Sequence, residues 1–189
     1  MPMPDLVTDL SRLSLADIAR MAADQRLPPV ASWNPEQTGH SRMRIARDGT
    51  WFHDGAPIRR ETMVRLFSTI LRREADGSHV LVTPAEKLVI DVDDAPFIAV
   101  EVKSDGTGNA RQLAFRLNTG DLVLASARHL VRIAGSEDNP RPYLGVRGGM
   151  EARINRAVYY ELATMAIDAG ADPPGLWSSG MFFALNPTP

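Results

Sequence analysis

Cysteine is absent from this chain of 189 residues. Its absence excludes thiol catalysis, thiolate metal sites and disulfide redox chemistry. Long apolar runs are also missing, since no stretch approaches the roughly 18 apolar residues that a transmembrane helix needs. The first residues, 1–9, carry neither the basic segment nor the apolar segment of a signal peptide. We therefore expect a soluble, cytoplasmic protein with no membrane association.

A strong charge of one sign is lacking too. Lys and Arg total 21 against 23 Asp and Glu, which gives a net charge of -2. Such a balance produces no field that would attract nucleic acid or anionic lipid from a distance. We expect no sequence-independent binding to nucleic acid. The hydrophobic content of 44% is that of an ordinary globular protein, long enough for one large core or two small cores packed together.

Familiar catalytic motifs are missing as well. The four histidines are widely separated and none forms an HxH or HExxH pair, so the local spacing of metal ligands is absent. The sequence contains no nucleophile elbow, no P-loop and no dinucleotide-binding glycine motif after a strand. These absences count against hydrolases, nucleotide triphosphatases and dehydrogenases. We expect neither a metal nor a cofactor.

Helical periodicity occurs in three places. A capping pattern at Ser14 opens a short helix that runs to about Gln25. Apolar residues at helical spacing predict a second helix between 59 and 76, and a third and longest helix at 150–169. Between these helices, alternating segments joined by short turns predict strands, beginning with a hairpin at Asp48-Gly49. Short connections make neighbouring strands antiparallel.

The order of strands and helix occurs twice along the chain. We therefore predict an α+β fold with a duplicated core of mostly antiparallel sheet plus helix. Residues 1–41 form an N-terminal helix and an irregular loop, 42–104 a first sheet-plus-helix unit, and 105–189 a second unit with a C-terminal tail. A single mixed domain is the alternative.

Arginines at predicted helix starts suggest where an anion would bind. Arginine supplies all basic residues except Lys87 and Lys103, that is 19 of the 21. Arg59 lies at the start of the second helix, and Arg147 precedes two glycines before the third. Free helix amides beside guanidinium groups suit a phosphate or a carboxylate. A tight strand-to-helix turn is the favoured explanation of the two glycines. Arg153 falls on a polar stripe of the third helix, which is either a free surface or an interface.

Carboxylates gather before Pro96. Asp91 and Asp93 would share one face of a strand, and Asp94 follows them. This arrangement suits a divalent cation or a shared proton, but we favour a solvated strand end and turn, because side chains that form turns with the backbone are expected before a proline. His53, Lys87 and Tyr143 are further polar candidates, which would form a pocket with the arginines only if the two units face one another.

Several longer strings identify a family. They include Asp48-Gly49-Thr50-Trp51-Phe52-His53, Val82-Thr83-Pro84-Ala85-Glu86-Lys87, Asp94-Ala95-Pro96-Phe97 and Pro142-Tyr143-Leu144. From about Leu27 to Phe183, the chain resembles the bacterial domain-of-unknown-function family 1285. The resemblance implies a duplicated α+β fold, a C-terminal half superficially like a pleckstrin-homology domain, and a site between the halves. It also implies a nucleotide-like ligand and a role in signal transduction, with no established activity.

These observations lead to an expected function. We expect a non-catalytic domain that binds or senses an anionic, nucleotide-like small molecule between the two halves. Arg59, Lys87 and Arg147 would neutralise the anion, His53 and Thr83 would form hydrogen bonds, and Trp51 or Tyr143 would stack on a ring. With Arg153, the predicted ligand-binding residues are Trp51, His53, Arg59, Thr83, Lys87, Tyr143, Arg147 and Arg153.

Two other functions stay open. In a protein–protein interaction module, the arginine and aromatic positions would form a binding surface for a protein partner. A hydrolase of phosphate esters would use Asp91 or Asp93 with His53 as acid and base, with or without a metal ion.

Overall fold

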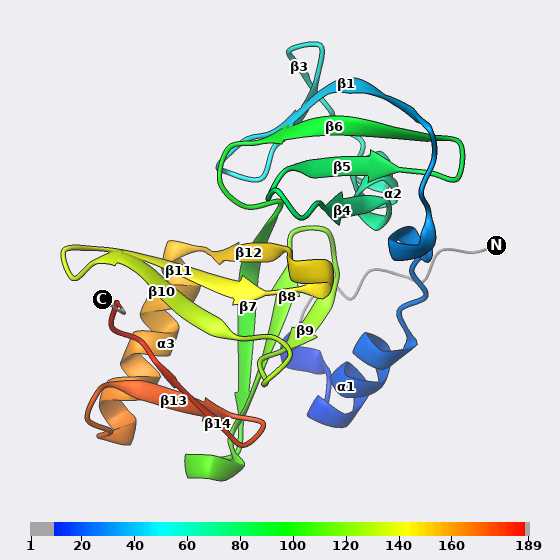
Figure 1. Cartoon of the computed structure of the whole chain (residues 1–189). Helices are drawn as coiled ribbons and strands as arrows, with labels where there is room; N and C mark the ends of the chain where they lie inside the picture. The colour runs from blue at the N-terminus through cyan, green and yellow to red at the C-terminus, as the bar shows by residue number, and fades with distance from the viewer. Residues whose placement is uncertain (1–9, 188–189) are drawn as a thin grey trace.

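The computed structural model describes residues 10–187. Residues 1–9, where we expect no signal peptide, lie outside this range. The described chain forms two six-stranded sheets, three α-helices and a two-stranded C-terminal sheet (Figure 1). The first sheet contains β1 (Gln37–Ile45), β2 (Trp51–His53), β3 (Ala56–Pro57), β4 (Leu71–Arg73), β5 (His79–Val82) and β6 (Glu86–Val92). The second contains β7 (Phe97–Asp105), β8 (Gln112–Leu117), β9 (Leu122–Leu124), β10 (Val131–Ser136), β11 (Asn139–Gly145) and β12 (Glu151–Ile154).

The helices and the tail surround these sheets. α1 (Leu15–Asp24) precedes the first sheet, α2 (Glu61–Thr69) lies within it in sequence, and α3 (Arg156–Ala169) follows the second. The tail forms a hairpin of β13 (Gly175–Ser178) and β14 (Met181–Ala184). No helix in residues 10–187 is long and apolar enough to span a membrane.

The two sheets have the same topology. The first has the order β3-β2-β1-β6-β5-β4, and the second, taken from its β9 edge, has the order β9-β8-β7-β12-β11-β10. In each sheet the two central strands are parallel, β1 with β6 and β7 with β12. All other neighbours are antiparallel. Each sheet is therefore two three-stranded meanders side by side, and the predicted duplication of a mostly antiparallel α+β unit is confirmed.

The strands fall into the two sheets differently from the sequence-based division. The strand at 97–105, which the prediction placed with the first unit, is β7 at the centre of the second sheet. The link between the sheets is therefore the short segment 93–96. In addition, β1 begins at Gln37, inside the segment expected to be irregular. Alternation of apolar residues identifies a strand but not the sheet that it joins.

The start of the third helix is also corrected. Helix α3 begins at Arg156, because residues 151–154 form β12, where buried Ala152 and Ile154 alternate with half-buried neighbours. The Asn155 side chain caps the helix by accepting a hydrogen bond from the Val158 amide at 2.9 Å. Consequently the glycine pair at 148–149 precedes a strand rather than a helix. Arg153 lies on that strand and not on a helical stripe.

The N-terminal helix is fixed on the second sheet. Ser14 caps α1 by accepting a hydrogen bond from the Asp17 amide, as the capping pattern predicts. Ile18 of α1 is fully buried and packs in a small cluster with Leu122 of β9. The Lys103 ammonium on β7 donates to the carbonyl groups of Leu10 and Leu13, which precede the helix. Helix α1 therefore lies beside β9, as Figure 1 shows.

Candidate functional site

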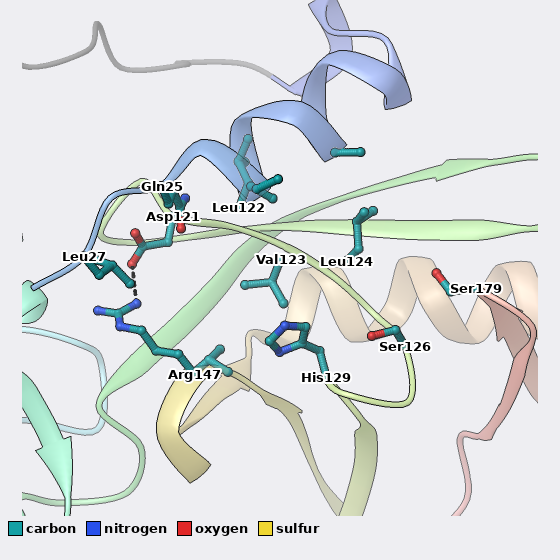
Figure 2. Close-up of a pocket in the computed structure, with 14 residues that line it drawn as sticks. Gln25, Leu27, Asp121, Leu122, Val123, Leu124, Ser126, His129, Arg147 and Ser179 are labelled. Atoms are coloured by element: carbon teal, nitrogen blue, oxygen red, sulfur yellow. Dashed lines mark hydrogen bonds and ion pairs between the residues drawn. The ribbon is translucent and has the colours of Figure 1, made fainter. Parts of the chain in front are cut away.

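Two adjoining hollows lie beside the second sheet. The first hollow, of about 420 Å³, is an open depression between α1, β9 and the loop 125–130 (Figure 2). The second hollow, of about 410 Å³, lies between that loop, β10 and a 3-10 turn at Arg147–Gly149. His129, Val146 and Arg147 line both hollows. The region around these three residues is the candidate site.

Arg147 has defined contacts at the junction of the hollows. Its Nη1 lies 3.3 Å from Asp121 Oδ2, and its Nη2 donates to the backbone carbonyl of Ser68 at 2.8 Å. The guanidinium also covers the Phe97 ring, 5.1 Å from the ring centroid. The side chain is 24% exposed. A guanidinium carries five N–H donors, and within residues 10–187 three of those of Arg147 have no acceptor assigned.

The first hollow has polar ends and an apolar middle. Figure 2 shows Asp121, Arg147 and Gln25 at one end, and Ser126 and Ser179 at the other. The Asp121 carboxylate is 18% exposed and also accepts a hydrogen bond from the Thr119 hydroxyl, again at Oδ2. The apolar lining residues are Ala19, Ala22, Ala23, Leu27, Leu122, Val123, Leu124 and Val146.

The second hollow is more basic. Arg128, Arg132 and Arg147 line it, against a single carboxylate, that of Glu151. Arg132 holds Glu151 through two hydrogen bonds of 2.7 and 2.8 Å, and these bonds raise the pKa of the guanidinium above its ordinary value. Gly148 and Gly149 have φ of +63° and +73°, and no heavy atom lies within 4 Å of where a Cβ would be. A ligand can approach their backbone closely, although no helix stands behind it.

Of the eight predicted residues, Arg147 alone lines these hollows. Tyr143 and Arg153 do come together, but around Asp94 in the link between the sheets. The Tyr143 hydroxyl donates to Asp94 Oδ1 at 2.6 Å, and Arg153 Nη1 lies 3.7 Å from Oδ2. Burial, and then the bond to Asp94, raise the pKa of Tyr143. The Arg132 guanidinium covers the tyrosine ring, so that face cannot stack on a ligand.

Three other predicted residues have structural partners. Trp51 is buried and stacks on Phe67 in the core, with a centroid distance of 6.4 Å, so it cannot stack on a ligand. The Thr83 hydroxyl accepts from the amide of Glu86 in the turn between β5 and β6. The Lys87 ammonium lies 3.7 Å from a carboxylate oxygen of Glu74.

The two remaining predicted residues are exposed on the first half. His53 lies beside Asp54, with 3.5 Å between Nε2 and Oδ2. Arg59 stands just before α2, whereas Arg147 contacts Ser68 near the other end of that helix. The nine residues of α2 span about 13 Å, at about 1.5 Å per residue, which separates Arg59 from Arg147. The predicted residues therefore do not form one pocket between the halves.

The predicted carboxylate cluster is also divided among separate partners. Asp91 lies 3.5 Å from His40, and Asp93 pairs with Arg44 at 2.5 Å. His53, the partner expected for acid–base chemistry, contacts neither of them in these pairs. Within residues 10–187, no three His, Asp or Glu side chains converge as metal ligands would.

Several lining residues escaped the sequence analysis. Asp121 ends a predicted hairpin turn, and His129 starts a predicted strand. Because these local structures account for both residue types, neither residue was predicted to belong to a binding site. The His129 ring nitrogen Nδ1 lies 3.1 Å from the carbonyl oxygen of Gly145, which fixes the ring at the junction of the hollows. No local signal indicated that α1 would wall the site, because that arrangement depends on long-range packing.

Two family models match the chain, one over each of its two parts. Residues 28–95 match the model described as "Domain of unknown function (DUF1285), N-terminal domain". Residues 96–185 match "Protein of unknown function (DUF1285), C-terminal domain". The two matches meet in the link between the sheets. Among curated proteins, none matches the chain.

Two solved structures are similar to the chain. A DUF1285 family protein from Silicibacter pomeroyi DSS-3 is 43% identical, with a TM-score of 0.76 over 90% of this chain and 95% of that one. A DUF1285 family protein from Shewanella baltica OS155 is 25% identical, with a TM-score of 0.52 over 65% of this chain and 91% of that one.

Proposed function

Because the chain belongs to the DUF1285 family, whose two domains have no assigned function, we propose a function from the site itself. The protein is a non-catalytic domain that binds a small molecule, and the carboxylate or phosphate group of that molecule is held by Arg147. One observation carries this proposal. Arg147 lines both hollows, and three of its N–H donors have no acceptor assigned within residues 10–187 beyond the contacts to Asp121 and Ser68. Guanidinium groups form strong, directional hydrogen bonds with carboxylates and phosphates.

The position of Arg147 supports a sensing role. It belongs to the second half, yet it holds the backbone of α2 in the first half through Ser68. An anion that draws the guanidinium toward a hollow would weaken this contact between the halves. Such a link between a ligand and the arrangement of two halves is what a role in signal transduction requires. The likeness of the second half to a pleckstrin-homology domain stays a prediction.

The ligand need not be a nucleotide. No Phe, Tyr or Trp side chain lines either hollow in the described part of the chain, so the stacking expected from Trp51 or Tyr143 is absent there, and the ring that lines both hollows is that of His129. The proposed ligand is therefore defined by its anionic group, and it need not contain an aromatic ring.

A thermal-shift screen tests this function. Purified protein is heated with inorganic phosphate, adenosine monophosphate, citrate or aliphatic carboxylates and amino acids, and a ligand that binds the folded state raises Tm. We expect at least one shift that Arg147→Gln removes. Arg73→Gln is the matched control, because Arg73 also donates to the other half, to the Gly149 carbonyl at 3.0 Å, but lines neither hollow. A shift that persists in Arg147→Gln, or no shift with any compound, contradicts the proposal.

A further inference from the structure

The first hollow presents both charges at one end. Asp121 and Arg147 lie 3.3 Å apart, both partly buried, and both line the cavity (Figure 2). The two contacts to the Asp121 carboxylate are made at Oδ2, by Thr119 and Arg147. Among residues 10–187 no side chain is assigned to Oδ1, which leaves that oxygen as an acceptor. This end therefore offers unused donors on Arg147 and an unused acceptor on Asp121.

Charge balance selects the ligand class for this end. A simple anion bound to Arg147 here would lie close to the Asp121 carboxylate, which repels it. A simple cation bound to Asp121 would be repelled by Arg147 in the same way. A molecule that carries both charges on neighbouring atoms offsets each of these repulsions with an attraction. An α-amino acid has its carboxylate and its ammonium on one carbon, at a separation similar to that of the two side chains.

The side chains that line the first hollow indicate what the uncharged part of the ligand is. Beyond the charged end, most of the lining side chains are aliphatic, including Ala22, Leu122 and Val123, and the polar ones are His129, Ser126 and Ser179. It contains no Phe, Tyr or Trp in the described part of the chain. Its volume of about 420 Å³ lies within the usual range of small-molecule sites, about 300–1,000 Å³. An aliphatic side chain fits these walls better than a sugar or a phosphate chain does.

From these observations we propose that the first hollow binds a free α-amino acid with an aliphatic side chain. The inference rests on the proposed function, since the amino acid's carboxylate is the anion at Arg147. Its ammonium donates to Asp121 Oδ1, and its side chain lies against Leu122 and Val123. The Gln25 amide lies at the same end and supplies a further polar contact.

Three related ligands separate the contributions of the two charges. L-leucine carries both, isocaproate has the same carbon skeleton without the ammonium, and isoamylamine lacks the carboxylate. Isothermal titration of the full chain should give leucine an affinity at least tenfold above that of either analogue. Asp121→Asn should lower the leucine affinity at least tenfold and leave isocaproate binding equal or stronger. Asp93→Asn is the control, because Asp93 pairs with Arg44 and lines neither hollow.

The outcomes distinguish this inference from the proposed function. If isocaproate binds the wild-type protein as tightly as leucine, the amino-acid inference is wrong while anion binding at Arg147 stands. If phosphate or another anion shifts Tm through Arg147 but leucine does not bind, the same conclusion holds. If no compound binds, both proposals fail. The ligand comparison uses the wild-type protein, so it decides the question even if Asp121→Asn does not fold.

Discussion

Arg147 donates a hydrogen bond to the backbone carbonyl of Ser68, 79 positions earlier and in the other half, at 2.8 Å. Arg73 returns a similar contact, from the first half to the carbonyl of Gly149 at 3.0 Å. Each half thus extends one arginine to the backbone of the other. The two contacts differ in surroundings, because Arg147 is partly buried and Arg73 donates at an exposed position. The Arg147 contact should therefore contribute more to stability.

Replacing Arg147 tests this difference. Arg147→Gln should lower the free energy of unfolding by about 1–3 kcal/mol, because it removes a hydrogen bond from a charged group and leaves Asp121 without its cation. Urea denaturation measures the change. Arg59→Gln is the matched control, an exposed arginine with no hydrogen bond or ion pair assigned within residues 10–187, and should change stability by less than about 0.5 kcal/mol. Equal urea midpoints for the two variants would show that the contact stabilises nothing.

The bond between Asp94 and Tyr143 is expected to stabilise the link between the sheets. Asp94 lies in that link, its side chain is 14% exposed, and it accepts the tyrosine hydroxyl at 2.6 Å. A double-mutant cycle with Asp94→Asn and Tyr143→Phe should give a coupling energy of about 1–3 kcal/mol. Additive effects of the two substitutions would show that the bond adds nothing to the stability of the protein.

The fold could be predicted largely from local pattern. Alternation and turn residues identify most strands because the burial of each short segment repeats with a period of two. The pattern is ambiguous at 150–155, where Ile154 fits both the alternation of β12 and the helical spacing that continues through Val158 and Leu162. The order of strands in each sheet depends on which meanders pair, and no local pattern carries that information.

The site was less predictable. Arg147 could be identified because the two glycines that follow it indicate an accessible backbone. Asp121 and His129 come from two different turns that only the folded chain brings beside α1. Trp51 was misleading, since an aromatic residue near a hairpin turn is available to a ligand only if it points outward. Its place in β2 directs it into the core against Phe67 instead.

Alkaline pH should destabilise the protein through Tyr143. Burial, with the bond to Asp94, raises the pKa of this tyrosine above its ordinary value of 10.0. The folded state therefore keeps a proton that the unfolded state loses, and stability falls as pH rises above about 10. Tyr143→Phe should reduce this fall, measured by urea denaturation at several pH values. Burial also raises the pKa of Tyr159, so Tyr159→Phe should remove a separate part of the loss of stability at alkaline pH. An unchanged pH dependence in Tyr143→Phe would contradict the assignment.

Mildly acidic pH should act through His79. Burial, and then the positive charge of Arg73, lower the pKa of this histidine below 6.5. The unfolded state therefore binds a proton more readily, so stability present at neutral pH is lost as pH falls below about 6.5. His79→Gln should flatten the dependence of the urea midpoint between about pH 7 and pH 5. His53→Gln, the same substitution at an exposed position, is the matched control.

Helix α1 should detach before the sheets unfold. A helix of ten residues is marginal alone in water, so α1 depends on the small cluster around Ile18 and Leu122. Ile18→Ala removes buried atoms and should destabilise the folded protein by about 2–5 kcal/mol. Most of this loss should fall on the free energy with which α1 packs against the second sheet. Hydrogen exchange should then show faster exchange of the α1 amides while those of α3 stay protected.

Arg20→Ala provides the control on the opposite face of α1, where the side chain is 71% exposed. It should leave exchange in α1 nearly unchanged. Because α1 walls the first hollow, Ile18→Ala should also weaken leucine binding in proportion to the fraction of molecules with α1 detached. If α1 and α3 lose protection together in Ile18→Ala, the helix is part of one cooperative unit. The hollow would then lose its α1 wall only when the whole protein unfolds.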